Sequence, residues 1–124
     1  MVGVGVDIVD IGRFERSLTR TPALEGRLFA DAERGRPPRS LAARFAAKEA
    51  LIKVLGDAGG FRWHDVQVHS DSHGKPSLVV TGALRDALDA RGVTGLHLSL
   101  SHDAGLACAF VVAESAPPVE GPGA

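Results

Sequence analysis

The sequence predicts a single small α+β domain, in which a largely antiparallel sheet packs on a long central helix. Two observations indicate this class. Short apolar, β-branched runs alternate with helical patterns, and several neighbouring runs are separated only by turn-forming residues, as in hairpins. One helical pattern, over 41–55, is long and rich in alanine and leucine. A chain of 124 residues, 44% of them hydrophobic, is long enough to form one core.

The first third of the chain is expected to form one strand and two short helices. The apolar run 2–9 predicts a buried strand, and Asp10 is placed to cap a helix over 11–20. Residues 24–36 predict a second short, arginine-rich helix, which Pro37 and the proline after it would end.

The long helix over 41–55 is expected to begin after Ser40, a good N-cap residue, and to end at Gly56, where a C-cap belongs. Its apolar positions follow helical spacing and are Leu41, Phe45, Leu51, Ile52 and Leu55. Such a helix would be mostly buried, so each charge on it needs an explanation.

The second half is expected to contribute two hairpins and one helix. Strands over 63–70 and 77–81 form the first hairpin, and an amphipathic helix over 82–92 follows, closed by its final glycine. Strands over 96–101 and 105–114 form the second hairpin, on either side of the turn "HDA".

The chain is expected to divide into a domain over 1–114 and a disordered Pro/Gly-rich tail over 115–124. Its formal net charge of −1 gives no global basic field, which argues against nucleic acid or a membrane as partner. One cysteine, Cys108, leaves no internal disulfide and fits a reducing compartment. The N-terminal stretch has no basic region and is interrupted by Asp7 and Asp10, so it predicts neither a signal peptide nor a membrane span. We therefore expect a cytoplasmic protein.

Glu49 stands in the middle of the long helix, with Arg44, Lys48 and Lys53 around it. A solvated pair between Glu49 and Lys53, four residues apart, would explain it as a surface contact worth about 0.3–0.5 kcal/mol. Phe45 lies on a nearby helical position, which indicates that this face is not wholly solvated. The other interpretation is that the helix directs Glu49 into a cleft.

Asp7 lies within an apolar strand, where an ionised carboxylate is costly unless it is paired, hydrogen-bonded or bound to a cation. Its ordinary interpretation is a position at the strand end, where it caps the next helix or bonds Arg13. His102, just after "LSLS", has an ordinary interpretation as a strand-end histidine.

A joint site is the functional alternative. Asp7 and Glu49 would hold a hard cation, and Lys53, Arg44 and His102 would lie nearby for phosphate. Mg²⁺ characteristically takes one or two carboxylates and completes its shell with phosphate oxygens and water. Spacing alone does not show that these groups converge, so the ordinary interpretations stay open at this point.

One tempting motif is interpreted as structural. Gly3-Val4-Gly5 lacks the third glycine and the following helix of a dinucleotide-binding fingerprint. It is therefore interpreted as part of the first strand.

Three segments together resemble a known family. They are "GVGVDIVDIGRF" (3–14), "LAARFAAKEALIKVLG" (41–56) and "LHLSLSHDAGLACAFVV" (96–112). In order and spacing they closely resemble the holo-[acyl-carrier-protein] synthases, the short 4′-phosphopantetheinyl transferases of the AcpS type, and "RFAAKEA" is highly specific. The segment "LFADAE" (28–33) resembles the family element F-T-x-x-E, with alanine where threonine is usual. That difference concerns a hydroxyl contact and leaves the metal site untouched.

The resemblance implies a 4′-phosphopantetheinyl transferase fold and a reaction. The enzyme would move the 4′-phosphopantetheine arm of coenzyme A onto a serine of apo acyl carrier protein, releasing adenosine 3′,5′-bisphosphate. Positioning, and neutralisation of the spreading negative charge, would do most of the catalytic work. Whether the carrier serves fatty-acid or polyketide synthesis stays open, as does the choice between Mg²⁺ and Mn²⁺.

The resemblance also implies roles for individual residues. Asp7 and Glu49 would bind Mg²⁺ together with the pyrophosphate of coenzyme A, and Glu49, or a metal-bound water beside it, would take the serine proton. His102 would contact the phosphates, and Lys53 and Arg44 would offset their charge. The predicted catalytic residues are Asp7, Glu49, Lys53 and His102, and the predicted cofactor-binding residues are Arg44, Lys53, Gly56 and His102.

Acyl carrier proteins are acidic, and a basic patch would recognise them by electrostatic complementarity. Arg13, Arg16 and Arg20 are the predicted carrier-binding residues, and Arg13 is the strongest candidate because it matches the family motif. Alternatively, these arginines form a solvated helix face with Glu15 and Glu25 as partners. The resemblance further implies a homotrimer with the cofactor at each subunit interface, which nothing in the periodicity shows.

Two other functions stay open on the sequence. A Mg²⁺-dependent hydrolase of a nucleotide or coenzyme A pyrophosphate would use the same groups with water as the nucleophile. A non-catalytic module would bind the carrier protein through its arginines. Neither accounts for all three matched segments.

Overall fold

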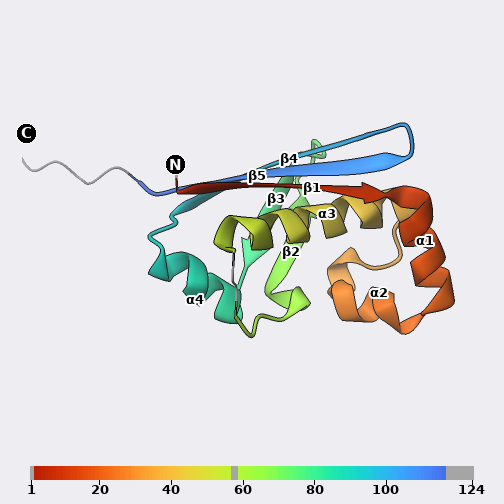
Figure 1. Ribbon diagram of the computed structural model, residues 1–124, viewed down its shortest axis with the longest axis horizontal. Coiled ribbons are helices and arrows are strands. Elements are labelled where there is room, and N and C mark those ends of the chain that lie inside the picture. The colour runs from red at the N-terminus through yellow and green to blue at the C-terminus, as the bar shows by residue number, and fades with distance from the viewer. Residues whose placement is uncertain (1, 57–58, 117–124) are drawn as a thin grey trace, which may run out of the picture.

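The computed structural model describes residues 2–56 and 59–116, and it has the predicted α+β architecture (Figure 1). The elements in chain order are β1 (Gly3–Asp10), α1 (Ile11–Arg20), α2 (Ala23–Leu28), η1 (Asp31–Glu33), α3 (Pro38–Leu55), η2 (Trp63–Asp65), β2 (Val66–Ser70), β3 (Pro76–Val80), α4 (Gly82–Ala90), β4 (Gly95–Asp103) and β5 (Leu106–Glu114). A three-stranded antiparallel sheet in the order β1-β5-β4 lies along α3 (Figure 1). β2 and β3 form a separate antiparallel hairpin. The prediction of an antiparallel sheet on a long central helix is confirmed.

Small side chains are frequent on the inner face of the sheet and on the buried face of α3. The alanines at 46, 47 and 50 of α3 are fully buried, as are Ala107, Ala109, Val111 and Ala113 of β5. Small side chains on both surfaces let the helix and sheet backbones come close together. The core of the domain therefore lies between α3 and the sheet.

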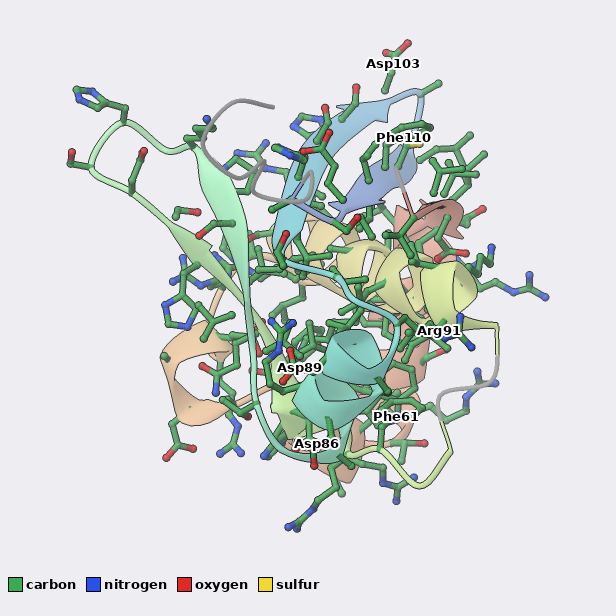
Figure 2. All side chains as sticks on the ribbon, turned by 90° about the vertical axis from the view of Figure 1, so that its left-hand side faces the viewer. Phe61, Asp86, Asp89, Arg91, Asp103 and Phe110 are labelled. Atoms are coloured by element: carbon green, nitrogen blue, oxygen red, sulfur yellow. The ribbon has the colours of Figure 1, made fainter. Side chains whose placement is uncertain are left out.

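The outer face of the same sheet carries large apolar side chains that nothing in the described chain covers. The exposed residues are Val4, Val6, Ile8, Leu106 and Phe110. They alternate along β1 and β5 with inward-facing residues, as the period of a strand requires. Figure 2 shows Phe110 on the sheet, well away from Asp86, Asp89 and Arg91 around α4.

The second predicted helix, over 24–36, is shorter than expected. α2 ends at Leu28, and Phe29 has an extended backbone with φ −124° and ψ 137°. This change of direction buries the Phe29 ring completely, edge-on against Phe14 of α1. The chain then forms η1, whose buried Glu33 pairs with Lys48 of α3. Tertiary packing, and not the two prolines, ends this helix.

The long helix begins earlier than predicted. α3 starts at Pro38, with Pro37 before it, and Ser40 lies inside its first turn instead of capping it. Proline is favoured at the first helical position, since its missing N–H would have no partner there. The C-terminal end is as predicted: Gly56 has a φ of 75°, and its N–H donates to the Ile52 carbonyl oxygen at 3.0 Å.

The turn of the last hairpin lies later in the chain than the predicted turn over 102–104. The turn residues are Ala104 and Gly105, with φ values of 51° and 77°, so His102 and Asp103 belong to β4. Two-residue hairpin turns of this kind need a positive φ at both positions. The first hairpin is confirmed, but its first strand begins at Val66, because Trp63–Asp65 forms the short helix η2.

Asp10 caps α1 as predicted, since its carboxylate accepts a hydrogen bond from the Arg13 N–H at 2.9 Å. Of the predicted tail, residues 117–124 lie outside the described residues, so its disorder stays a prediction. No helix in the described residues is both long and apolar enough to cross a membrane.

Candidate active site

Asp7 lies on the side of β1 that faces α3, between exposed Val6 and Ile8. Its side chain is only 15% exposed. Lys53, from the last turn of α3, places its Nζ 2.9 Å from Asp7 Oδ1 and 3.0 Å from the Val6 carbonyl oxygen. The partner of Asp7 is therefore Lys53, and not Arg13.

Glu49 lies one turn before Lys53 on α3 and lines the same pocket as Asp7. This pocket, called here the acidic pocket, is lined by Asp7, Ile8, Val9, Asp10, Arg13, Phe14, Ser17, Phe45 and Glu49. Burial, and then the charge of Asp7, raise the pKa of Glu49, while Lys53 lowers it in part. Within the described residues, the Glu49 carboxylate has no hydrogen bond or ion pair. The surface pair with Lys53, which was the ordinary alternative for Glu49, does not form, because the ammonium group bonds Asp7 instead.

The acidic pocket fits a hard divalent cation by the chemistry of its donors. Two carboxylates from different elements, Asp7 and Glu49, interact closely enough for one to raise the pKa of the other. In the described chain, the carboxylate oxygens of Glu49 have no hydrogen-bond or ion-pair partner and are therefore available to a cation. Carboxylate oxygens, with room for phosphate and water, are the ligands that Mg²⁺ takes.

Gly5 sets how near these two carboxylates come. A Cβ built on Gly5 would lie 1.9 Å from the carbonyl oxygen of Ala50, so no side chain fits between β1 and α3. Asp7 is two residues beyond Gly5, and Glu49 immediately precedes Ala50. Sequence interpretation missed this role of Gly5. A glycine inside a strand is the available signal, since it often marks close approach of another backbone.

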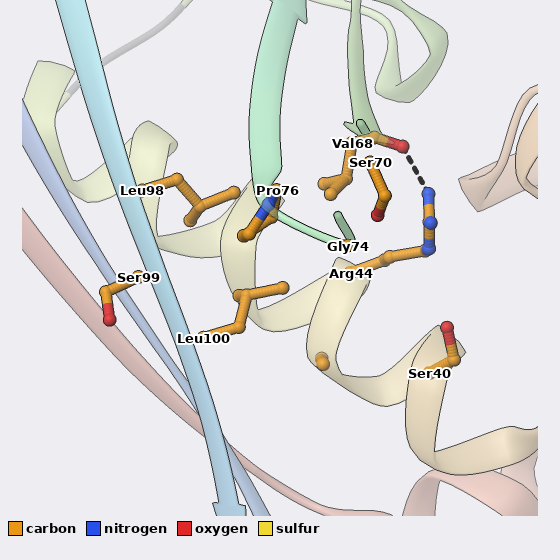
Figure 3. A pocket seen from close by; sticks show the side chains of 10 residues that line it. Ser40, Arg44, Val68, Ser70, Gly74, Pro76, Leu98, Ser99 and Leu100 are labelled. Atoms are coloured by element: carbon orange, nitrogen blue, oxygen red, sulfur yellow. Dashed lines mark hydrogen bonds between the residues drawn. The ribbon is translucent and has the colours of Figure 1, made fainter. Parts of the chain in front are cut away.

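Arg44 lies on another side of α3 and not beside Glu49. Its guanidinium donates to the Val68 carbonyl oxygen (Figure 3). The same group lies 3.8 Å from Glu33 Oε2. The side chain is buried, and burial lowers its pKa, with a smaller contribution from Arg36. Arg44 also borders a second pocket between α3, β4 and the β2–β3 hairpin (Figure 3). Within one subunit it therefore does not reach the acidic pocket.

Lys48 and Glu33 form a buried ion pair that sequence interpretation did not foresee. Lys48 Nζ lies 2.7 Å from Glu33 Oε1 and 2.7 Å from the Leu28 carbonyl oxygen, and both side chains are fully buried. Glu33 Oε2 also accepts from the Val68 N–H at 3.0 Å. Burial lowers the pKa of Lys48, and the bond to Glu33 raises it in part. This network joins η1 and β2 to α3.

His102 stands on β4, at the opposite edge of the sheet from Asp7. Its partner in the register is Ala107 of β5, and β5 separates β4 from β1. Two strand spacings amount to about 10 Å, so His102 does not join the acidic pocket of its own subunit. Gly56 ends α3 three residues after Lys53.

The three predicted carrier-binding arginines are exposed on α1. Arg13 borders the acidic pocket, and Arg16 and Arg20 border a shallow depression farther along the helix. Their spacing of three and four residues puts them on one helix face. Within the described residues, none of the three has an ion-pair partner.

Two aromatic side chains of the pocket were not predicted to line the site. Phe14 of α1 and Phe45 of α3 stack with ring centroids 5.2 Å apart and form an apolar wall beside Glu49. Phe45 was identified from helical spacing only as a core position. Nothing in the spacing indicated that these two rings meet.

An antiparallel sheet on a long helix, with Asp7 and Glu49 lining one pocket between them, is the geometry at which the comparisons with known proteins are made. The model of the 4′-phosphopantetheinyl transferase superfamily matches residues 3–111, and the chain belongs to this family. The predicted family is thereby confirmed.

Named relatives agree with this assignment. The holo-[acyl-carrier-protein] synthase of Clavibacter sepedonicus is 64% identical over 112 residues, which are 90% of this chain and 94% of the relative. The crystal structure of the synthase from Neisseria meningitidis has a TM-score of 0.81 and 35% identity, covering 93% of this chain and 100% of that one. The crystal structure of the synthase from Helicobacter pylori in complex with coenzyme A has a TM-score of 0.79 and 29% identity. The match covers 90% of this chain and 99% of that one.

Proposed function

We propose that this chain transfers the 4′-phosphopantetheine group of coenzyme A to a serine of apo acyl carrier protein, with Mg²⁺ at the acidic pocket. The observation that carries the proposal is that Asp7 and Glu49 line one pocket, with Glu49 free of protein partners in the described chain. Family membership and relatives that are holo-[acyl-carrier-protein] synthases support the same reaction. The chain is then an enzyme, and coenzyme A is its donor substrate.

In this reaction the serine oxygen forms a bond to the phosphorus that carries the pantetheine arm. The bond from that phosphorus to the bridging oxygen breaks, and adenosine 3′,5′-bisphosphate leaves with the bridging oxygen. The serine proton passes to Glu49 or to a water beside it. A raised pKa makes Glu49 a better proton acceptor than an ordinary carboxylate.

Asp7 and Glu49 would hold the cation, which when bound would act as a Lewis acid and a template for the pyrophosphate. Lys53 bears a positive charge beside Asp7 and would offset the charge of the phosphates. Phosphoryl transfer relies on positioning and charge neutralisation, and these are the contributions that the three residues would make. Gly56 is proposed to end α3 beside the cofactor.

The second part of the site would come from a neighbouring subunit. His102 stands across the sheet from Asp7, so a phosphate contact requires the His102 of another copy. The outer apolar face of β1 and β5 supplies a surface on which copies of this chain would associate. A homotrimer with three equivalent interfaces is the proposed assembly. Arg44, which borders the second pocket, would meet the cofactor only across such an interface.

Arg13, Arg16 and Arg20 are proposed to receive the acidic carrier protein. Their exposure and lack of ion-pair partners in the described chain leave them available to it. Arg13 also borders the acidic pocket, so a carrier on this face would bring its serine near Glu49. The single Cys108, a free thiol, agrees with the predicted cytoplasmic location, which stays a prediction.

Intact-protein mass spectrometry of an apo acyl carrier protein tests the proposal. The carrier is incubated with this protein, coenzyme A and Mg²⁺, in parallel with chelator and with the Glu49→Gln variant. We expect the carrier to gain one phosphopantetheine only with the cation and the unaltered protein. Cofactor cleavage without carrier modification would indicate a hydrolase. An intact cofactor with several carriers would favour a binding module.

A further inference from the structure

Lys53 holds Asp7 in the way that a bound cation would. Its Nζ lies 2.9 Å from Asp7 Oδ1 and 3.0 Å from the Val6 carbonyl oxygen, so one positive group sits against two oxygens of β1. The ammonium group therefore occupies the place on Asp7 that a metal ion would need.

The two partners differ in how freely they can move. The Asp7 side chain is 15% exposed and fixed within β1, whereas the Lys53 side chain is 53% exposed. Lysine carries its charge on a flexible four-carbon stem. The Lys53 side chain can therefore move away from Asp7 without disturbing the core, whereas the Asp7 side chain stays in place on β1.

We propose that in the free protein the Lys53 ammonium group takes the place of the cation on Asp7, which is called here its stand-in role. Lys53 leaves Asp7 only when the cation and pyrophosphate bind together. In the free protein Lys53 opposes cation binding, and in the loaded site it binds the pyrophosphate oxygens. The same side chain thus weakens the binding of a cation alone and strengthens the binding of a cation with its phosphate ligand. For the pyrophosphate, the inference rests on the function proposed above.

The charges around the acidic pocket favour this exchange. Asp7, Glu49 and Asp10 contribute negative charge there, and Arg13 and Lys53 contribute positive charge. A divalent ion on Asp7 would stand within a few ångströms of the ammonium group and repel it. Pyrophosphate brings negative charge to the same place, which gives Lys53 a new partner as it releases Asp7.

The alternative role for Lys53 is that of a structural ion pair, which holds α3 to β1 through Asp7. Such a contact would also oppose a cation on Asp7, because the ammonium charge stands beside the carboxylate. It would gain nothing from pyrophosphate, so the two roles differ in whether pyrophosphate reverses the effect that removing the lysine has on cation affinity.

The test measures binding of Mn²⁺, a paramagnetic substitute for Mg²⁺, by following the free ion with electron paramagnetic resonance. Without any phosphate ligand, we expect Lys53→Met to bind Mn²⁺ about tenfold more tightly than the unaltered protein. Lys53→Arg keeps the charge and should bind it as weakly as the unaltered protein. Lys75→Met, in the exposed β2–β3 turn, is the matched control and should change nothing.

The second titration repeats the measurement with saturating inorganic pyrophosphate. Here the order should reverse, with the unaltered protein binding Mn²⁺ more tightly than Lys53→Met. Equal or weaker Mn²⁺ binding by Lys53→Met without pyrophosphate overturns the inference. So does Mn²⁺ binding by Lys53→Met that stays tighter than that of the unaltered protein with pyrophosphate, and so does the absence of Mn²⁺ binding by every variant. Thermal melting of each variant checks that the fold is kept.

Failure of the inference and failure of the proposed function give different results. Carrier modification with an unchanged Mn²⁺ affinity in Lys53→Met would keep the transferase and remove the stand-in role. Tighter Mn²⁺ binding by Lys53→Met that pyrophosphate reverses, without modification of any carrier, would keep the stand-in role and remove the transferase.

Discussion

The carbonyl oxygen of Ala50 occupies the space in which a side chain on Gly5 would begin. A Cβ on Gly5 would lie 1.9 Å from that oxygen and 2.9 Å from the carbonyl carbon. Both neighbours are backbone atoms of α3, so neither can turn aside as the end of a side chain would. The spacing between β1 and α3, and with it the distance between Asp7 and Glu49, depends on this contact.

Gly5→Ala is expected to push α3 away from β1 and to separate the two carboxylates. Overpacking of this kind costs about 1–3 kcal/mol of folding free energy, and Mn²⁺ affinity should fall with it. Gly95→Ala is the matched control, since a Cβ on that strand glycine meets nothing within 4 Å. Urea unfolding of both variants, with Mn²⁺ titration of each, measures the effect. Equal losses of stability in the two variants would contradict the role assigned to Gly5.

The sequence predicted the sheet and the long helix from alternation and helical period, and the family from its motifs, whereas the metal ligands Asp7 and Glu49 stay a prediction. It did not predict contacts that depend on how elements meet. Phe29 leaves the helical conformation because its ring packs on Phe14, and a window of local residues carries no sign of that partner. Lys48 and Glu33 are fifteen residues apart, and nothing local indicates that they pair.

Glu33→Gln is expected to destabilise the fold strongly, because it leaves the buried ammonium group of Lys48 without its counter-charge. Breaking a buried ion pair from one side typically costs about 3–5 kcal/mol. Asp31→Asn is the control: its ion pair with Arg34 is exposed, and its loss should cost less than about 1 kcal/mol. Chemical denaturation gives both values.

Adding Lys48→Met to Glu33→Gln should recover part of that loss, since no unpaired charge then remains in the core. The double variant would be more stable than the sum of the two single changes implies. Strict additivity would mean that the two side chains do not act as a pair.

Glu49→Gln is expected to stabilise the metal-free protein near pH 7. The pKa of Glu49 is raised in the fold, so the folded state binds its proton more tightly than the unfolded chain does. Folding free energy is therefore lost as the pH rises from the ordinary glutamate value of 4.5 through the raised value. In chelator, the melting temperature of the variant should exceed that of the unaltered protein at neutral pH, and the difference should shrink at about pH 4. A difference in melting temperature that grows toward low pH would contradict this prediction, because the Glu49 carboxylate would then stabilise the fold when ionised.

Phe110→Lys is expected to reduce association between subunits, because it places a charge on the outer apolar face of the sheet. Phe110 is 46% exposed in the single chain. Val79→Lys is the matched control, since Val79 is similarly exposed at 43% but lies on β3, in the other sheet. Light scattering after size-exclusion chromatography gives the mass of each variant. An unaltered mass for Phe110→Lys would argue against this face as the interface.

Mixed subunits test whether one site uses Glu49 from one copy and His102 from another. Glu49→Gln and His102→Ala are each expected to be nearly inactive alone. Co-refolded at equal amounts, they should form some interfaces in which an intact Glu49 meets an intact His102.

With random assembly, about one quarter of the interfaces in a symmetric ring carry both intact residues, so about one quarter of the activity should return. If both residues served a site within one subunit, every site would lack one of them, and mixing would restore nothing. The position of His102 on β4, with β5 between it and Asp7 on β1, is the reason to expect recovery. Carrier modification followed by mass spectrometry gives the recovered fraction, and separately refolded, unmixed variants give the baseline.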